Sequence, residues 1–85
     1  MKIFKWELQI TDVQEIKMPM RTKILSLQTQ SDFPTMWGLC DPEAQLVTRT
    51  FAMYGTGHEL PQNIGKYIGT FQIMNGGFVY HVFEL

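Results

Sequence analysis

The chain has 85 residues, a formal net charge of −1 and a single cysteine, and 45% of its residues are hydrophobic. This length predicts one domain over residues 1–85, the charge excludes the basic surface that binding to nucleic-acid polymers requires, and the lone Cys40 excludes an intramolecular disulfide. Charged residues are only 18% of the chain, below the roughly 25% usual for a soluble domain, so we expect a homo-oligomer that buries apolar surface between subunits.

The first segment alternates apolar and polar side chains, which is typical of a strand that shows one face to a core. Phe4, Trp6, Leu8 and Ile10 are expected on its apolar face. The segment lacks the continuous apolar run of a secretory signal, and no run approaches the ~18 residues that span a bilayer. These features predict an intracellular protein with no membrane partner.

Three further strands are predicted in the first half of the chain, at residues 14–18, 23–30 and 35–40. A turn is expected at 31–34, where the sequence Ser-Asp-Phe-Pro is typical of a chain reversal. Leu25 and Leu27 are expected together on the apolar face of their strand, opposite Ser26. The two strands that flank the turn are predicted to form a hairpin.

The second half begins with residues 41–44, Asp-Pro-Glu-Ala, which resemble a helix start but are followed by no helical periodicity. One helical turn or a type I turn is the most that this segment supports. A strand is predicted at 47–54, followed by a long loop at 55–65. Loops longer than the usual ~4–6 residues are enriched in binding function.

The last part of the chain reads as two aromatic-rich strands joined by Asn75-Gly76. An Asn-Gly step supplies the positive φ angles of a tight hairpin. Six or seven short strands without an internal repeat predict an all-β fold, either a small antiparallel barrel or a two-sheet sandwich.

The glycine-rich segment Gly55-Thr56-Gly57-His58 is the main candidate for a ligand site. Two glycines let the backbone approach a ligand closely, and successive N–H groups can bind an anion such as phosphate. The segment is neither a phosphate loop nor a dinucleotide fingerprint. A turn that needs positive φ angles is the alternative interpretation.

Aromatic side chains form the second part of the candidate site. The candidates for a stacking wall are Trp37, Tyr54, Tyr67, Phe71, Phe78 and Tyr80. Flat rings offer contact area with little loss of rotamer entropy, and Tyr54, Tyr67 and Tyr80 also carry a polar tip. Together with the glycine-rich segment, these tyrosines predict a small-molecule site; burial in the core and in a subunit interface is the alternative.

Catalysis is disfavoured by the residues that remain. His81 is expected to be half-buried on the same apolar side as Phe83, with a backbone carbonyl as its partner. No pair of residues has metal-ligand spacing, and Ser26, Ser31 and Cys40 all lack the context of an activated nucleophile. The sequence therefore predicts no enzyme, no metal and no cofactor.

Several segments resemble a group of small uncharacterised proteins encoded by bacteriophages and prophages. The clearest are Tyr54-Gly-Thr-Gly-His58, Tyr67-Ile-Gly-Thr-Phe-Gln72 and Phe78-Val-Tyr-His-Val-Phe-Glu84, supported by Met1–Lys5, Ile16–Pro19 and Lys23–Ser26. The resemblance covers nearly the full length and implies a protein of the host bacterial cytoplasm.

By analogy, the resemblance implies an accessory phage protein that acts by binding rather than by catalysis. Its expected partner is a host defence protein, or a small nucleotide-like signal that it sequesters. A small structural or morphogenetic phage component is the alternative.

Overall fold

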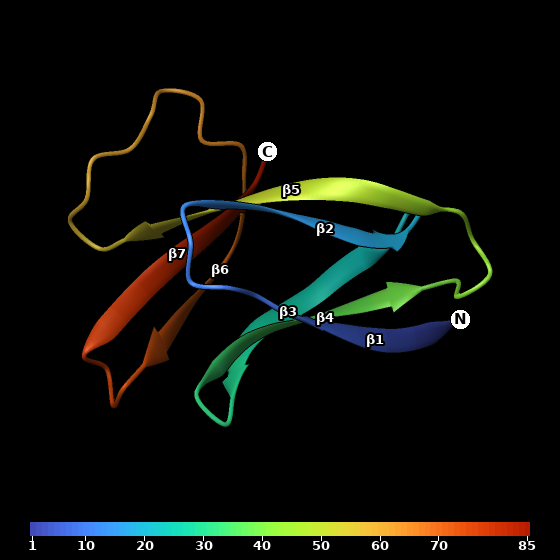
Figure 1. The fold of residues 1–85 in the computed structure, drawn as a ribbon, viewed down its shortest axis with the longest axis horizontal. Coiled ribbons are helices and arrows are strands. Elements are labelled where there is room, and N and C mark those ends of the chain that lie inside the picture. Colours follow the sequence, from blue (N-terminus) through green and yellow to red (C-terminus); the bar gives the residue numbers. More distant parts are fainter.

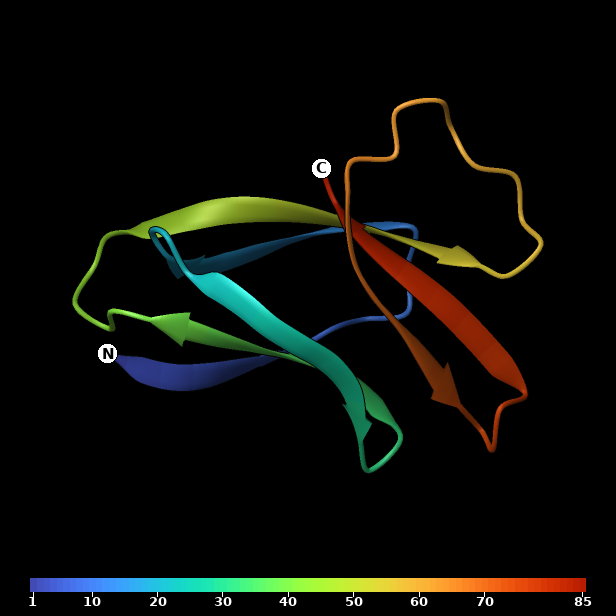
Figure 2. The same cartoon turned by 180° about the vertical axis from the view of Figure 1, so that it is seen from behind.

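A computed structural model describes residues 1–85 and contains seven strands in two antiparallel sheets, without a helix. The strands are β1 (Lys2–Glu7), β2 (Val13–Pro19), β3 (Lys23–Gln30), β4 (Phe33–Cys40), β5 (Leu46–Gly55), β6 (Lys66–Ile73) and β7 (Phe78–Glu84). The sheet orders are β1-β4-β3 and β2-β5-β7-β6, as Figure 1 and, from behind, Figure 2 show. The predicted all-β class is confirmed as a two-sheet sandwich that does not close into a barrel.

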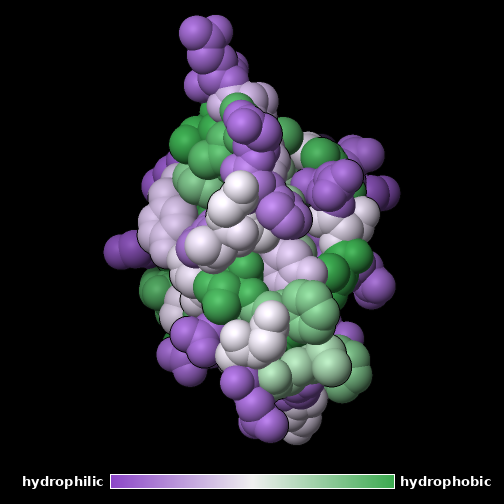
Figure 3. Space-filling model, turned by 90° about the vertical axis from the view of Figure 1, so that its left-hand side faces the viewer, coloured by the Kyte–Doolittle hydropathy of each residue, from purple (hydrophilic) through white to green (hydrophobic).

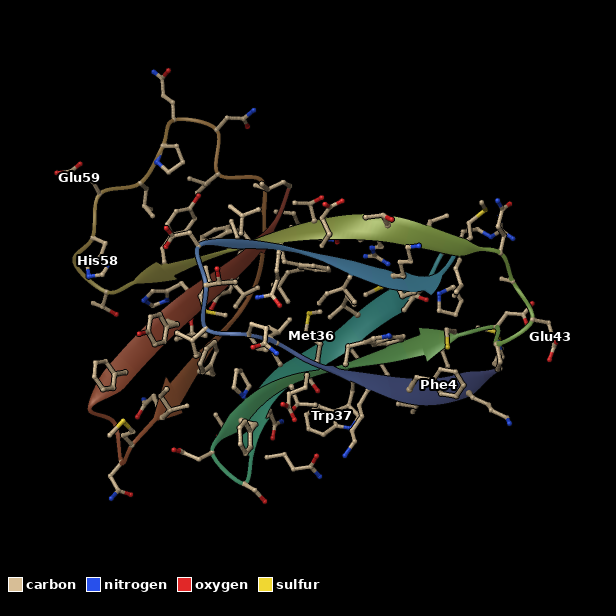
Figure 4. The ribbon with its side chains drawn as sticks, in the orientation of Figure 1. Phe4, Met36, Trp37, Glu43, His58 and Glu59 are labelled. Carbon is tan, nitrogen blue, oxygen red and sulfur yellow. The ribbon has the colours of Figure 1, made fainter.

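The core lies between the two sheets and takes alternate residues from their facing sides. Its buried members are Leu8, Met18, Leu27, Met36, Phe51, Met53, Phe71 and Val82. Figure 4 shows Met36 between the sheets and its neighbour Trp37 on the other side of β4. The two-residue period of apolar side chains is therefore the pattern that builds this core.

β3 departs from the expected alternation at Leu25. The pairing of β3 with β4 shifts between Ile24 and Ser26, so β3 carries one extra residue at this point. A bulge of this kind changes which face the following residues share. Leu27 is buried, whereas Leu25 is 45% exposed. The prediction that Leu25 and Leu27 share one apolar face is therefore wrong.

The segment between β1 and β2 also differs from the prediction. The Gln14 side chain accepts a hydrogen bond from the Gln9 N–H at 3.0 Å and donates one to the Gln9 carbonyl at 2.8 Å. These bonds hold the chain where it leaves one sheet for the other. Leu8 is buried, but Ile10 lies in this connection and is exposed, so the expectation that both share one strand face is wrong.

The turn between β3 and β4 is shorter than predicted. Ser31 and Asp32 both have positive φ, 51° and 68°, as a two-residue type I′ turn requires. Phe33 and Pro34 belong to β4 instead of the turn. Proline fits there because β1 pairs with β4 only beyond it, and the Pro34 carbonyl accepts a hydrogen bond from the Leu8 N–H at 2.9 Å.

The C-terminal hairpin of β6 and β7 is confirmed, with a longer turn than the predicted Asn-Gly step. The turn occupies residues 74–77, and Met74, Asn75 and Gly76 all have positive φ. The Met74 N–H donates to Asp32 Oδ1 at 3.1 Å. This hydrogen bond joins the tips of the two hairpins.

Residues 41–44 form a turn and no helix, which is one of the two forms predicted. The Ala44 N–H donates to the Asp41 carbonyl at 3.0 Å, and the Glu43 N–H donates to Asp41 Oδ1 at 3.0 Å.

The structure contains no helix long and apolar enough to cross a membrane.

One ion pair links β5, β7 and the turn between β2 and β3. The Arg49 guanidinium donates to both oxygens of Glu84, at 2.6 and 2.7 Å, and to the Thr22 carbonyl at 2.5 Å. The hydrogen bond to Glu84 raises the pKa of Arg49, although burial opposes this effect. The two bonds to Glu84 make this a bidentate contact between β5 and β7. Both side chains are about one-fifth exposed.

Candidate functional site

The loop between β5 and β6 is anchored at both ends. At its start, the His58 N–H donates to the Gly55 carbonyl at 3.1 Å and closes a turn. At its end, Gly65 has φ 79° and passes so close to β7 that an added Cβ would lie 2.3 Å from the Glu84 carbonyl oxygen. These two anchors hold the loop beside the outer face of the four-stranded sheet.

A pocket of about 240 Å³ lies between this loop and the outer face of the sheet. It is lined by Tyr54, Gly55, Thr56, Gly57, His58, Leu60, Tyr67, His81 and Phe83. The structure thus brings together every predicted site residue except Tyr80. Figure 3 looks at this end of the molecule and shows apolar and polar surface intermixed, with a hydrophilic projection at the top.

Three aromatic rings form one wall of the pocket. Phe83 of β7 contacts Tyr54 of β5 and Tyr67 of β6, with ring centroids 5.9 and 5.5 Å apart and planes inclined by 61° and 62°. Phe83 is nearly buried, while Tyr67 is 55% exposed. The edge-to-face contacts fix the rings and leave part of Tyr67 accessible to a ligand.

His81 contributes the polar part of the pocket. Its Nε2 lies 2.7 Å from Thr56 Oγ1 and its Nδ1 lies 2.9 Å from Thr70 Oγ1. Thr70 is its direct partner in the pairing of β6 and β7, and the turn after β5 brings Thr56 to the other nitrogen. The expectation of a backbone carbonyl partner is therefore wrong, because hydroxyl groups occupy both nitrogen positions.

His58 sits at the end of β5, where its ring covers Gly55. An added Cβ on Gly55 would lie 2.9 Å from His58 Cε1, so glycine is what allows this contact. Figure 4 shows His58 and Glu59 at the left-hand end of the molecule, with Glu59 directed outward. The lining contains no carboxylate and no lysine, and no group of three or more His, Cys, Asp or Glu residues is placed to hold a metal ion.

Tyr80 does not reach the pocket. It precedes His81 in β7 and therefore points to the opposite face, where it packs against the core and stacks on Phe78 with centroids 6.4 Å apart. Phe71 is buried in the core and Trp37 belongs to the other sheet. The candidate aromatic rings consequently do not form a single wall.

Three pocket residues were missed by sequence reasoning: Leu60, His81 and Phe83. Alternation along β7 places His81 and Phe83 on the same face, and this pattern is visible in the sequence. Their position opposite Tyr54 depends on the pairing of β7 with β5, in which Tyr54 faces His81. The sequence does not reveal which strands are neighbours, so the polar role of His81 could not be found from it.

The model of one protein family, described as a domain of unknown function (DUF7352), matches residues 1–85. The match covers all seven strands and the loop that borders the pocket. A search of curated proteins and a search of solved structures found no match.

Proposed function

This chain belongs to the DUF7352 family of domains of unknown function, and we propose that it is a non-enzymatic binding module for a small, planar, nucleotide-like molecule. The observation that carries the proposal is the convergence of Tyr54, Tyr67 and Phe83 with the Thr56–His81 hydrogen bond around one pocket. Apolar walls with a few convergent polar groups are typical of small-molecule sites.

The size of the pocket limits the ligand. A volume of about 240 Å³ is below the ~300–1,000 Å³ of most ligand sites, so it suits a single heterocyclic ring system. A nucleobase offers both the flat face that stacks on an exposed aromatic ring and the rim of donors and acceptors that a polar wall recognises. Attached sugar or phosphate groups would extend past the mouth toward solvent.

The polar groups favour binding over catalysis. Thr56 and His81 are a hydroxyl and an imidazole in contact, as in a nucleophile–base pair. The third member of such a triad is normally a carboxylate, which stabilises the imidazolium that forms during reaction. Here Thr70 occupies that position, and a neutral hydroxyl does not supply the required charge.

The biological setting of the proposal comes from the phage resemblance. In that setting the protein acts in the bacterial cytoplasm and captures a nucleotide-like signal of a host defence. Stoichiometric capture needs a preformed pocket, and the hydrogen-bonded wall and the anchored loop support this part of the proposal.

Replacement of Tyr67 by alanine is expected to weaken binding about 5- to 150-fold, because base–aromatic stacking contributes about 1–3 kcal/mol per base. A panel of nucleosides and nucleotides screened by thermal shift identifies the probe, and calorimetry then gives its Kd. Phe78→Ala is the matched control, since Phe78 is a similarly exposed ring on the same hairpin outside the pocket. Equal losses in both variants, or no stabilisation by any probe, would contradict the proposed site.

Docking on a host protein is a second candidate function, favoured by the free edge of β1. β1 pairs only with β4, and its Ile3 and Phe4 are 59% and 39% exposed. An unpaired edge with apolar side chains is suited to accept a strand from another chain, including a second copy of this one.

If the β1 edge mediates self-association, light scattering should give a mass above the 9.9 kDa of one chain. Ile3→Lys places a charge on this edge and is expected to return the mass to that of a monomer. Lys17→Glu on β2 is the control for a charge change on an exposed residue elsewhere. A wild-type protein that stays monomeric at high concentration would argue against this edge as a site of self-association.

A further inference from the structure

A network of four side chains connects two parts of the pocket lining. Thr56 Oγ1 bonds His81 Nε2 at 2.7 Å, His81 Nδ1 bonds Thr70 Oγ1 at 2.9 Å, and Thr70 Oγ1 bonds the Tyr67 hydroxyl at 2.5 Å. Thr56 and Tyr67 line the pocket, whereas Thr70 does not. Three members of the network, Thr56, His81 and Tyr67, therefore line the pocket, and only Thr70 lies outside the lining.

The protonation state of His81 sets the direction of the two hydrogen bonds that His81 makes. A neutral imidazole has one donor nitrogen and one acceptor nitrogen. With the proton on Nδ1, His81 donates to Thr70, and when Thr70 in turn donates to Tyr67, the Tyr67 hydroxyl is left to donate to a ligand. Nε2 then accepts from Thr56, whose oxygen is left as an acceptor for the ligand.

The other neutral tautomer reverses all of these bonds. Tyr67 donates to Thr70, Thr70 donates to Nδ1, and Nε2–H donates to Thr56, whose hydroxyl then donates into the pocket. When all hydroxyl protons point the same way along the network, each tautomer leaves one terminal hydroxyl as a donor and the other as an acceptor. Only a protonated His81 makes both terminal hydroxyls donors.

Resting on the proposed function, we infer that His81 determines specificity by selecting an uncharged ligand that carries one donor and one acceptor on its rim. The lactam edge of a nucleobase, with an N–H beside a C=O, has this chemistry. A purely accepting group such as a carboxylate would require His81 to take up a proton. The other titratable groups in the lining are Tyr54 on β5, His58 in the turn and Tyr67 on β6, and the lining contains no lysine or arginine that could pair with a carboxylate in place of His81.

The decisive variant is Thr70→Val, because it cuts the network without changing the pocket lining. Uridine is the probe, since its base has an N–H between two carbonyl groups. Uridine binding is expected to weaken about 5- to 10-fold, the effect of about one net hydrogen bond. Thr70→Ser keeps the hydroxyl and should restore the affinity, and Thr48→Val on β5 is the control for the loss of an exposed threonine hydroxyl away from the pocket.

Two further measurements complete the test. Calorimetry in buffers of different ionisation heat should show no proton uptake when uridine binds. Nitrogen-15 NMR of the ligand-free protein reports the tautomer balance of His81, and Thr70→Val should change it.

The outcomes separate this inference from the proposed function. A wild-type protein that binds none of the nucleosides overturns both. Uridine binding that is unaffected by Thr70→Val, or that takes up one proton per ligand, overturns the inference and leaves the binding function standing.

Discussion

Replacing Gly65 by alanine is expected to lower the free energy of unfolding by roughly 3 kcal/mol or more. The φ of 79° alone costs an L-residue about 1–2 kcal/mol. The larger part comes from the Cβ, which would lie 2.3 Å from the Glu84 carbonyl oxygen. Because this neighbour is the backbone of β7, it cannot rotate away as a side chain can. Urea unfolding followed by tryptophan fluorescence measures the loss.

Gly57 offers a matched control for the Gly65 prediction. Its φ of 86° is similar, but nothing lies within 4 Å of an added Cβ. Gly57→Ala is therefore expected to cost only the conformational term, about 1–2 kcal/mol. If the two variants lost the same amount, the close approach of the loop to β7 would not be the reason for glycine at position 65.

Replacing Arg49 by methionine is expected to cost about 2–3 kcal/mol. The substitution leaves the Glu84 carboxylate and the Thr22 carbonyl without their charged donor at a site that is about one-fifth exposed. Arg21→Met is the control, since Arg21 is exposed and makes only a 3.4 Å contact to the Met20 sulfur. Its loss should stay within about 0.5 kcal/mol in the same urea experiment.

A double variant and a pH series sharpen the Arg49 prediction. Arg49→Met with Glu84→Met removes both charges and should recover part of the stability lost in the single variant. The raised pKa of Arg49 means that its contribution is complete below the ordinary arginine pKa and is lost only as pH rises through the raised value. The difference between wild type and Arg49→Met should therefore be constant from about pH 7 to 10. A difference that shrinks within this range would contradict the assignment.

The sequence predicted the fold class because the apolar period of two is strong in most strands. Ile16 and Met18 share a face in β2, and Phe51 and Met53 share one in β5, each pair two residues apart. The prediction failed where local geometry interrupts the period, at the bulge of Leu25. A bulge is defined by how two strands pair, and the sequence of one strand does not show how it pairs with its neighbour.

The candidate site was predicted where it is local in sequence and missed where it is not. The turn at 55–58 was found because glycines and a long loop are visible in the sequence. Tyr80 was grouped with it by residue type, but strand alternation directs it to the core and presents His81 to the pocket instead. The hydroxyl partners of His81 depend on three separate segments that only the folded sheet assembles.

The pocket takes every lining residue from positions 54–83, and the three-stranded sheet supplies none of them. None of its side chains belongs to the buried cluster between the two layers, and Phe83 is buried on the outer face of its sheet instead. Replacing an exposed lining residue therefore changes the surface of the pocket and leaves no cavity in the core between the sheets. Such a layout lets the lining of the pocket vary while the scaffold stays unchanged, so a few outward-facing replacements can reshape the pocket without altering the fold.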